Sequence, residues 1–135
     1  MIVPYEMVYK TAIPTLRAMI ARKLIEDHGL TQEEVAKKLE ITQAAVSYYV
    51  KGKRAMMLRL DDVDEIQYMT NEMADLLFKG EMSRKEFRRR ITEACDCIRE
   101  LKLLCELHKR LEPDVDDEDC HACDETLKKR VKLMI

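Results

Sequence analysis

Thiols are the side chains of this sequence best suited to chemistry. All five cysteines of the 135-residue chain lie between Cys95 and Cys123. Four of them follow the spacing C-x9-C-x14-C-x2-C, namely Cys95, Cys105, Cys120 and Cys123. Two thiolates separated by two residues can chelate one metal centre. The spacing therefore predicts a metal or redox site in the C-terminal part of the chain.

Two ligand sets fit these thiols. One set joins Cys105 and His108, which share one face of a helix, to Cys120 and Cys123. Three cysteines and one histidine suit tetrahedral zinc. The other set replaces His108 by Cys95, and four cysteine thiolates typically hold an iron-sulfur cluster of four irons and four sulfides. A site without metal, with reduced or disulfide-linked thiols, is the third interpretation.

The four-cysteine set depends on a break in the helical pattern. Apolar residues recur at helical spacing through residues 84–111. On an unbroken helix Cys95 and Cys105 would lie about 15 Å apart along the axis, which no single cluster bridges. This set therefore requires a break near residues 100–102. The fifth thiol, Cys97, is expected to be a small core residue.

The composition favours helices as the elements that position these thiols. Hydrophobic residues make up 47% of the chain and charged residues 37%, with only three Gly and three Pro. Strands and tight turns need more turn residues, so we expect an all-α fold. No apolar run reaches the roughly 18 residues of a membrane span, and the first residues lack the order of a signal peptide. We therefore expect a cytoplasmic protein with no membrane association.

Capping signals mark where the helices begin. The expected N-caps are Thr31, Thr42, Asp61 or Asp62, and Ser83, of which Thr31 and Ser83 open capping boxes with Glu34 and Glu86. The amphipathic stretches 62–79 and 84–111 are rich in Leu, Ile and Met. We expect them to form a dimer surface, to pack on the N-terminal part, or both.

Residues 31–52 carry the most specific pattern of the sequence. Two short capped helices are separated only by Glu40 and Ile41. Ala36 is small where the two helices must approach closely, and Val46 supplies an apolar contact between them. This pattern predicts a helix-turn-helix, whose second helix enters the major groove of DNA.

This stretch resembles helix-turn-helix regulators of the Cro/repressor type, the XRE family, over about residues 13–54. The family usually has Gly at the turn position, where φ is positive, whereas this chain has Glu40. The positions that carry the resemblance are Thr31, Gln32, Ala36, Ile41, Thr42, Gln43, Val46, Ser47, Lys51 and Gly52.

The resemblance implies binding to double-stranded DNA. A homodimer is expected, because one domain of this type covers one half-site and specific affinity usually needs two. A glutamine can pair with adenine, and an alanine methyl can contact a thymine methyl. The implied DNA-binding residues are Gln32, Lys51, Lys53 and Arg54 at phosphates, and Thr42, Gln43, Ala44, Ser47 and Tyr48 on the second helix.

The whole chain is similar to small archaeal regulators that join this domain to a C-terminal cysteine cluster. In such proteins a Cys precedes an IR…LLC-x-LH segment and a late C-x2-C. The matching residues are Cys95, Ile98, Arg99, Leu103, Leu104, Cys105, Leu107, His108, Cys120 and Cys123. Similar regulators often have Gly where Lys102 stands. The resemblance favours the four-cysteine iron-sulfur set and implies a redox or iron sensor.

Charge divides the chain into two expected parts. Residues 1–60 hold ten Lys and Arg against six Asp and Glu, and residues 61–135 hold fourteen against twenty. We expect a helix-turn-helix DNA-binding domain in the first part and a helical dimerisation region with the cysteine cluster in the second.

The sequence contains no Ser/His/Asp set, no phosphate-binding Gly loop and no paired carboxylates near a His. We therefore expect neither an enzyme nor a small-molecule substrate. Two alternatives to the sensor stay open. One is the same regulator with a purely structural zinc, and the other is a protein-interaction adaptor that borrows the helical hairpin without binding DNA.

Overall fold

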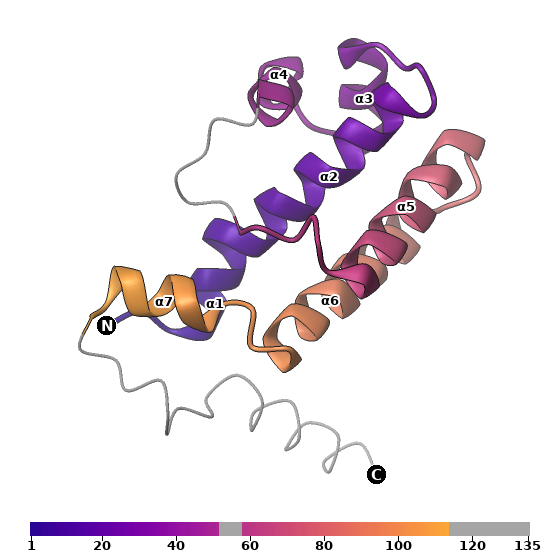
Figure 1. Cartoon of the computed structure of the whole chain (residues 1–135). Coiled ribbons are helices and arrows are strands. Elements are labelled where there is room, and N and C mark those ends of the chain that lie inside the picture. Colours follow the sequence, from indigo (N-terminus) through magenta and orange to yellow (C-terminus); the bar gives the residue numbers. More distant parts are fainter. Residues whose placement is uncertain (52–57, 114–135) are drawn as a thin grey trace, which may run out of the picture.

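The computed structural model describes residues 1–51 and 58–113. In these ranges every regular element is a helix, which confirms the predicted all-α class (Figure 1). In chain order the elements are α1 (Pro4–Met7), a π-helical turn η1 (Val8–Ala12), α2 (Ile13–Glu26), α3 (Gln32–Leu39), α4 (Gln43–Lys51), α5 (Asp64–Lys79), α6 (Arg84–Glu100) and α7 (Cys105–Leu111).

The first three elements follow one another without a break and form one long rod (Figure 1). Pro14 stands at the start of α2 and has no N–H to donate to the preceding turn. The wider turn η1 directly before it accommodates the missing bond. Within the rod, the Thr11 and Thr15 hydroxyls donate to the carbonyl oxygens of Met7 and Thr11 at 2.5 and 2.7 Å.

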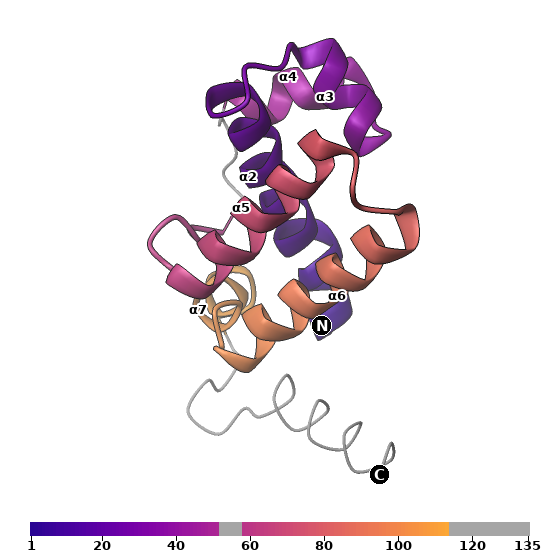
Figure 2. The same cartoon turned by 90° about the vertical axis from the view of Figure 1, so that its right-hand side faces the viewer.

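One apolar core lies where α2, α3, α4 and α5 meet. Its buried residues are Ile20, Ala21, Leu24, Val35, Ala36, Leu39, Val46, Met73, Ala74 and Leu77. Three residues of α5 complete this core, so α5 belongs to the same packed unit as α2 and the α3–α4 hairpin. Figure 2 shows α3 and α4 at one end of the molecule, α7 at the other, and α5 and α6 between them.

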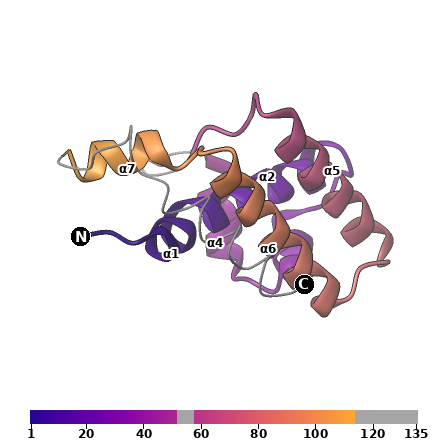
Figure 3. The same cartoon turned by 90° about the horizontal axis from the view of Figure 1, so that it is seen from below.

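A second core joins the N-terminal half of the rod to α6 and α7. Its buried residues are Met7, Ala12, Leu16, Met19, Leu60, Ile66, Ala94, Cys95, Ile98, Leu104 and Leu107. Helices before and after residue 60 thus pack together in both cores, and α2 contributes to both. The division of functions at residue 60 stays a prediction. Seen from below, α7 lies beside α1 (Figure 3).

The helical pattern of residues 84–111 is interrupted between α6 and α7. Lys102 has a φ of 59°, in the left-handed region. Its N–H donates to the Arg99 carbonyl at 3.0 Å, and the N–H of Leu103 donates to the Ile98 carbonyl at 3.0 Å. This pair of bonds is the Schellman arrangement that ends a helix. The break that the four-cysteine set requires is therefore present, at the position where the resemblance expects glycine.

The predicted cap of α5 is wrong. α5 begins after Val63, whose side chain makes no capping bond. The N–H of Val63 donates to the Leu60 carbonyl at 3.1 Å, which closes a turn over Asp61 and Asp62. Because Leu60 is buried in the core and anchors this turn, both aspartates fall too early to cap the helix.

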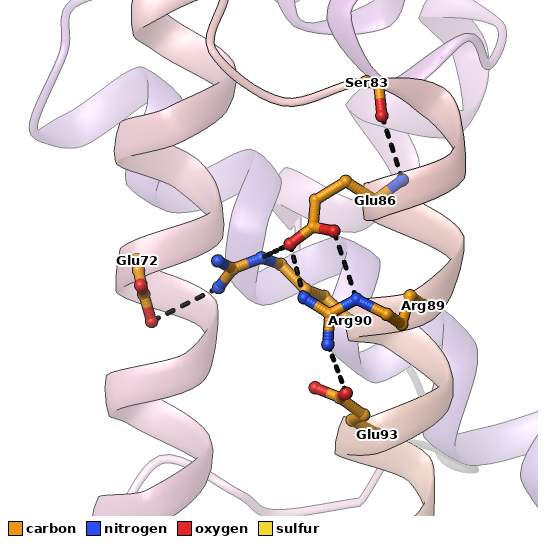
Figure 4. A network of polar contacts seen from close by, with 6 residues as sticks. All are labelled: Glu72, Ser83, Glu86, Arg89, Arg90 and Glu93. Carbon is orange, nitrogen blue, oxygen red and sulfur yellow. Dashed lines mark hydrogen bonds and ion pairs between the residues drawn. The ribbon is translucent and has the colours of Figure 1, made fainter.

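A network of charges joins α6 to α5 (Figure 4). The Ser83 hydroxyl accepts from the N–H of Glu86 at 3.1 Å, so Ser83 caps α6 as predicted. Glu86 does not complete the predicted capping box. Its carboxylate instead accepts hydrogen bonds from Arg89 and Arg90. Arg90 also pairs with Glu72 of α5 at 3.3 Å. These bonds, from Arg89 first and then Arg90, lower the pKa of Glu86 from 4.5 to about 2.

Candidate nucleic-acid interface and thiol site

The start of α3 is held by the complete capping box that the sequence predicts. The Thr31 hydroxyl accepts from the N–H of Glu34 at 3.1 Å, and the Glu34 carboxylate accepts from the N–H of Thr31 at 3.1 Å. Both bonds satisfy amides that have no partner inside the helix. Gln32 follows as the first residue of α3 and is half-buried.

The turn between α3 and α4 is tight and left-handed. Glu40 has a φ of 55°, which places a glutamate where the resemblance expects glycine. The N–H of Ile41 donates to the Ala36 carbonyl at 3.1 Å and closes the end of α3. The Thr42 hydroxyl then accepts from the N–H of Ala45 at 3.0 Å. Thr42 therefore caps α4 as predicted, and the two helices follow each other after only two residues.

Burial decides which face of α4 points outward. Val46 is 0% exposed and Tyr49 is 8% exposed, so these two residues turn inward. Ala36 of α3 is also buried, which agrees with its predicted place at the close approach of the two helices. The neighbouring Tyr48 is 52% exposed. The two adjacent tyrosines therefore have different roles, one in the core and one at the surface.

The outward face of α4 carries the residues predicted to contact DNA. Thr42, Gln43, Ala44, Tyr48 and Lys51 are exposed, and Ser47 is half-buried. The face is not covered by any other element among the described residues. The remaining two predicted contacts, Lys53 and Arg54, lie outside the described residues.

One residue that supports α4 carries no signal in the sequence. Arg22 of α2 donates through Nη2 to the carbonyl oxygen of Tyr49 at 3.3 Å. The guanidinium thus lies near the C-terminal end of α4, where the helix dipole favours a positive charge. The two residues are 27 positions apart, and no capping or periodic pattern relates them.

The family model described as Helix-turn-helix matches residues 22–60. This segment is a helix-turn-helix domain. The domain comprises the end of α2, all of α3 and α4, and the chain as far as Leu60. The match supports a DNA-binding transcriptional regulator of the XRE type, with double-stranded DNA as its partner. No curated protein and no solved structure matches the chain in the same comparisons.

The three thiols that the structure describes, Cys95, Cys97 and Cys105, lie at the end of the molecule that is remote from the helix-turn-helix domain. Cys95 is 6% exposed in the core between α2, α6 and α7. Burial, and after it the charge of Asp96, raises the pKa of this thiol to about 11. Cys97 packs partly buried against the same core, as expected, and burial also raises its pKa.

The start of α7 carries the other described ligand candidates. Cys105 is its first residue and is half-buried. Nε2 of His108 lies 3.2 Å from a carboxylate oxygen of Glu112, whose other oxygen lies 3.2 Å from the N-terminal amine of Met1. The C-terminal end of α7 is therefore attached to Met1 through Glu112.

Two of the predicted ligands, Cys120 and Cys123, lie outside the described residues. Within residues 1–51 and 58–113, no three His, Cys, Asp or Glu side chains are grouped as a metal site would require. None of the helices that the structure describes is long and apolar enough to cross a bilayer.

Proposed function

We propose that this chain is a homodimeric, sequence-specific transcriptional regulator of the cytoplasm that reads DNA with α4. The observation that carries the proposal is the division of α4 into two faces. Val46 and Tyr49 are buried, while Gln43 and Tyr48 stand exposed on the opposite side. A helix of nine residues with a polar outward face fits the major groove.

Each outward residue has a chemical role in this proposal. Gln43 pairs with an adenine, and the Ala44 methyl contacts a thymine methyl. Ser47 and Tyr48 lie further along the helix and face the next bases, while Thr42 caps the helix at the groove. Phosphates are contacted by Gln32 at the start of α3 and by the cations Lys51, Lys53 and Arg54.

Binding to duplexes selected from a random-sequence library tests the proposal. The Gln43→Ala variant should bind the selected duplex about five- to a hundredfold more weakly, because one bidentate base contact is worth about 1–3 kcal/mol. It should bind unselected duplexes as the wild type does. Gln67→Ala on α5 is the matched control. Equal loss on all duplexes would place Gln43 at a phosphate instead of a base.

A homodimer is proposed because two half-sites give specific affinity. The exposed apolar side chains on α5, Tyr68 at 70% and Phe78 at 43%, support a partner on that helix. Sedimentation of Tyr68→Glu against the wild type tests the surface. A shift from dimer to monomer supports α5 as the interface, and an unchanged dimer places the interface elsewhere.

The cysteine cluster is proposed to hold an iron-sulfur cluster through Cys95, Cys105, Cys120 and Cys123. The break at Lys102 supports this set, because it removes the geometric objection of an unbroken helix. The donor chemistry also fits, since cysteine thiolates are the usual ligands of such clusters. When bound, the cluster would supply a redox change at the end of α6.

To bind the cluster, Cys95 must lose its thiol proton. Burial opposes this loss, because it raises the pKa of the thiol. Cys105 stands beyond the break, as the first residue of α7. These two residues attach the site to both helices, so the occupied and empty forms would differ in how α6 and α7 pack on the rod.

A structural zinc is the second candidate for the same site. The contact between His108 and Glu112 favours it, because a carboxylate on one ring nitrogen commonly orients a histidine whose other nitrogen binds zinc. In this form Cys105, His108, Cys120 and Cys123 are the ligands.

Anaerobic reconstitution with iron and sulfide separates the two metals. A brown product with visible absorption bands, lost in Cys105→Ser and retained in Cys97→Ser and His108→Ala, supports the iron-sulfur cluster. A colourless protein that contains one zinc per chain, lost in His108→Ala, supports the structural site.

A further inference from the structure

An ion pair ties the turn of the helix-turn-helix domain to α6. Nη2 of Arg84 lies 2.6 Å from one carboxylate oxygen of Glu40, and its Nε donates to the other at 2.8 Å. Two parallel bonds of this kind fix the relative orientation of the groups as well as their distance. The two residues stand 44 positions apart in the sequence.

The conformation of Glu40 makes this contact unusual. The residue has a φ of 55°, and a side chain costs free energy in that region while glycine does not. Glycine at this position would close the same turn without strain but would have no contact with α6. Glutamate at this position therefore strains the turn, but it also attaches the turn to a distant helix.

Arg84 is held where it can serve as an anchor. It is the first residue of α6, directly after the N-cap Ser83. Further along, α6 is buried in the second core through Ala94 and Ile98. The anchor therefore belongs to a helix whose position is set by packing remote from DNA.

Direct packing between the end of α3 and the start of α6 is incomplete. A hollow of about 90 Å³ lies there, lined by apolar residues such as Leu39, Leu77 and Phe87, with Glu40 and Arg84 also on its wall. Phe87 of α6 packs against the core that contains Leu39, so the ion pair adds a polar link to this apolar contact, at the turn itself.

We propose that Arg84 is a positioning residue for DNA recognition, acting through Glu40 on the turn that directs α4. The chain passes from Glu40 through Ile41 to the cap Thr42, so the orientation of the turn sets the N-terminal end of α4. Gln43 and Ala44 stand at that end. The inference rests on the proposed function, and it makes α6 part of the DNA-reading unit.

A double-mutant cycle on DNA affinity tests this role, using a duplex selected by the wild type from a random library. Arg84→Ala and Glu40→Gln should each weaken binding about two- to fivefold, since an exposed ion pair contributes little free energy. The double variant should be no weaker than either single one. The charge swap Glu40→Arg with Arg84→Glu should restore most of the affinity. Arg89→Ala, an arginine of α6 paired within its own helix, should bind as the wild type does.

Two results would overturn the inference. If the losses from Arg84→Ala and Glu40→Gln add in the double variant, each residue acts alone, with Arg84 at a phosphate. If the charge swap stays as weak as the single variants while its melting temperature is unchanged, the pair does not position α4.

Amide hydrogen exchange at Ile41 and Thr42 in the free protein distinguishes this failure from failure of the proposed function. Faster exchange in Arg84→Ala, with no further increase in the double variant, supports the anchor even if no duplex is bound with sequence preference. Unchanged exchange at both amides overturns it.

Discussion

Arg22 of α2 donates a hydrogen bond to the backbone carbonyl of Tyr49 in α4, across 3.3 Å. The bond joins the rod that runs through both cores to the helix that is proposed to read DNA. It lies on the inner side of α4, opposite Gln43 and Tyr48. The orientation of the reading helix is therefore set partly by a charged side chain of the rod.

Replacing Arg22 should loosen α4 without altering its outward face. Arg22→Met keeps most of the apolar length but removes the donor, which should lower the free energy of unfolding by about 1 kcal/mol. Affinity for the selected duplex should fall together with stability. Urea unfolding and fluorescence anisotropy measure the two effects. Arg22→Lys retains a positive charge, so a loss as large as that of Arg22→Met would mean that the guanidinium geometry matters more than the charge.

The adjacent tyrosines of α4 should respond in opposite ways to truncation. Tyr49→Ala removes a buried ring and should cost about 3–5 kcal/mol of stability, whereas Tyr48→Ala should change stability by less than about 0.5 kcal/mol. Only Tyr48→Ala should weaken DNA binding in protein that remains folded. Thermal unfolding and duplex titration measure this. A stable Tyr48→Ala variant with full affinity for every duplex would remove Tyr48 from the interface.

Glycine at the α6–α7 break should stabilise the protein. Lys102 has a φ of 59°, so Lys102→Gly removes strain of about 1 kcal/mol, while Lys102→Val should be destabilising because a β-branched side chain fits that conformation poorly. Glu40→Gly should gain less, because it also loses the pair with Arg84. Chemical denaturation of the three variants checks the order. Lower stability of Lys102→Gly than of the wild type would contradict the left-handed conformation.

Acid should weaken the group of ion pairs that Glu86 makes with Arg89 and Arg90 along α6. Its folded-state pKa is lowered from 4.5 to about 2 by bonds from Arg89 and Arg90. The carboxylate therefore stabilises the folded state above pH 4.5, and this contribution is lost as the pH falls from 4.5 towards 2. The difference in stability between the wild type and Glu86→Gln should shrink across the same window. Unfolding measured at a series of pH values checks this, with Glu106→Gln as the control, and a constant difference would contradict it.

The features that could be predicted from the sequence are those whose partners lie close along the chain. Thr31 and Glu34 are three positions apart, and Thr42 caps the amide of Ala45 within the same turn. Such bonds depend on residue type and local spacing, so they are readable without a structure. The break before Cys105 is only a requirement of the four-cysteine set, since an unbroken helix separates Cys95 from Cys105 by too great a distance, and the structure shows that it is present.

The predictions that failed concern capping signals that stronger contacts override, whether from the core or from the same helix. Asp61 and Asp62 are good capping residues, but the burial of Leu60 sets the turn that contains them, and α5 begins later. Glu86 is correctly spaced for a capping box with Ser83, but two arginines offer it charged partners.

By itself, the sequence determined the helical class, because this follows from composition. It also determined the two capped helices of residues 31–51 and the outward set of polar residues on the second helix, because these follow from spacing within a few turns. Only the tertiary structure decided that Tyr49 is buried and Tyr48 exposed, that Arg22 and Arg84 reach the hairpin from other helices, and that Cys95 belongs to the core. Those outcomes depend on contacts between residues that are far apart in the chain, and they form only when the cores along α2 are assembled.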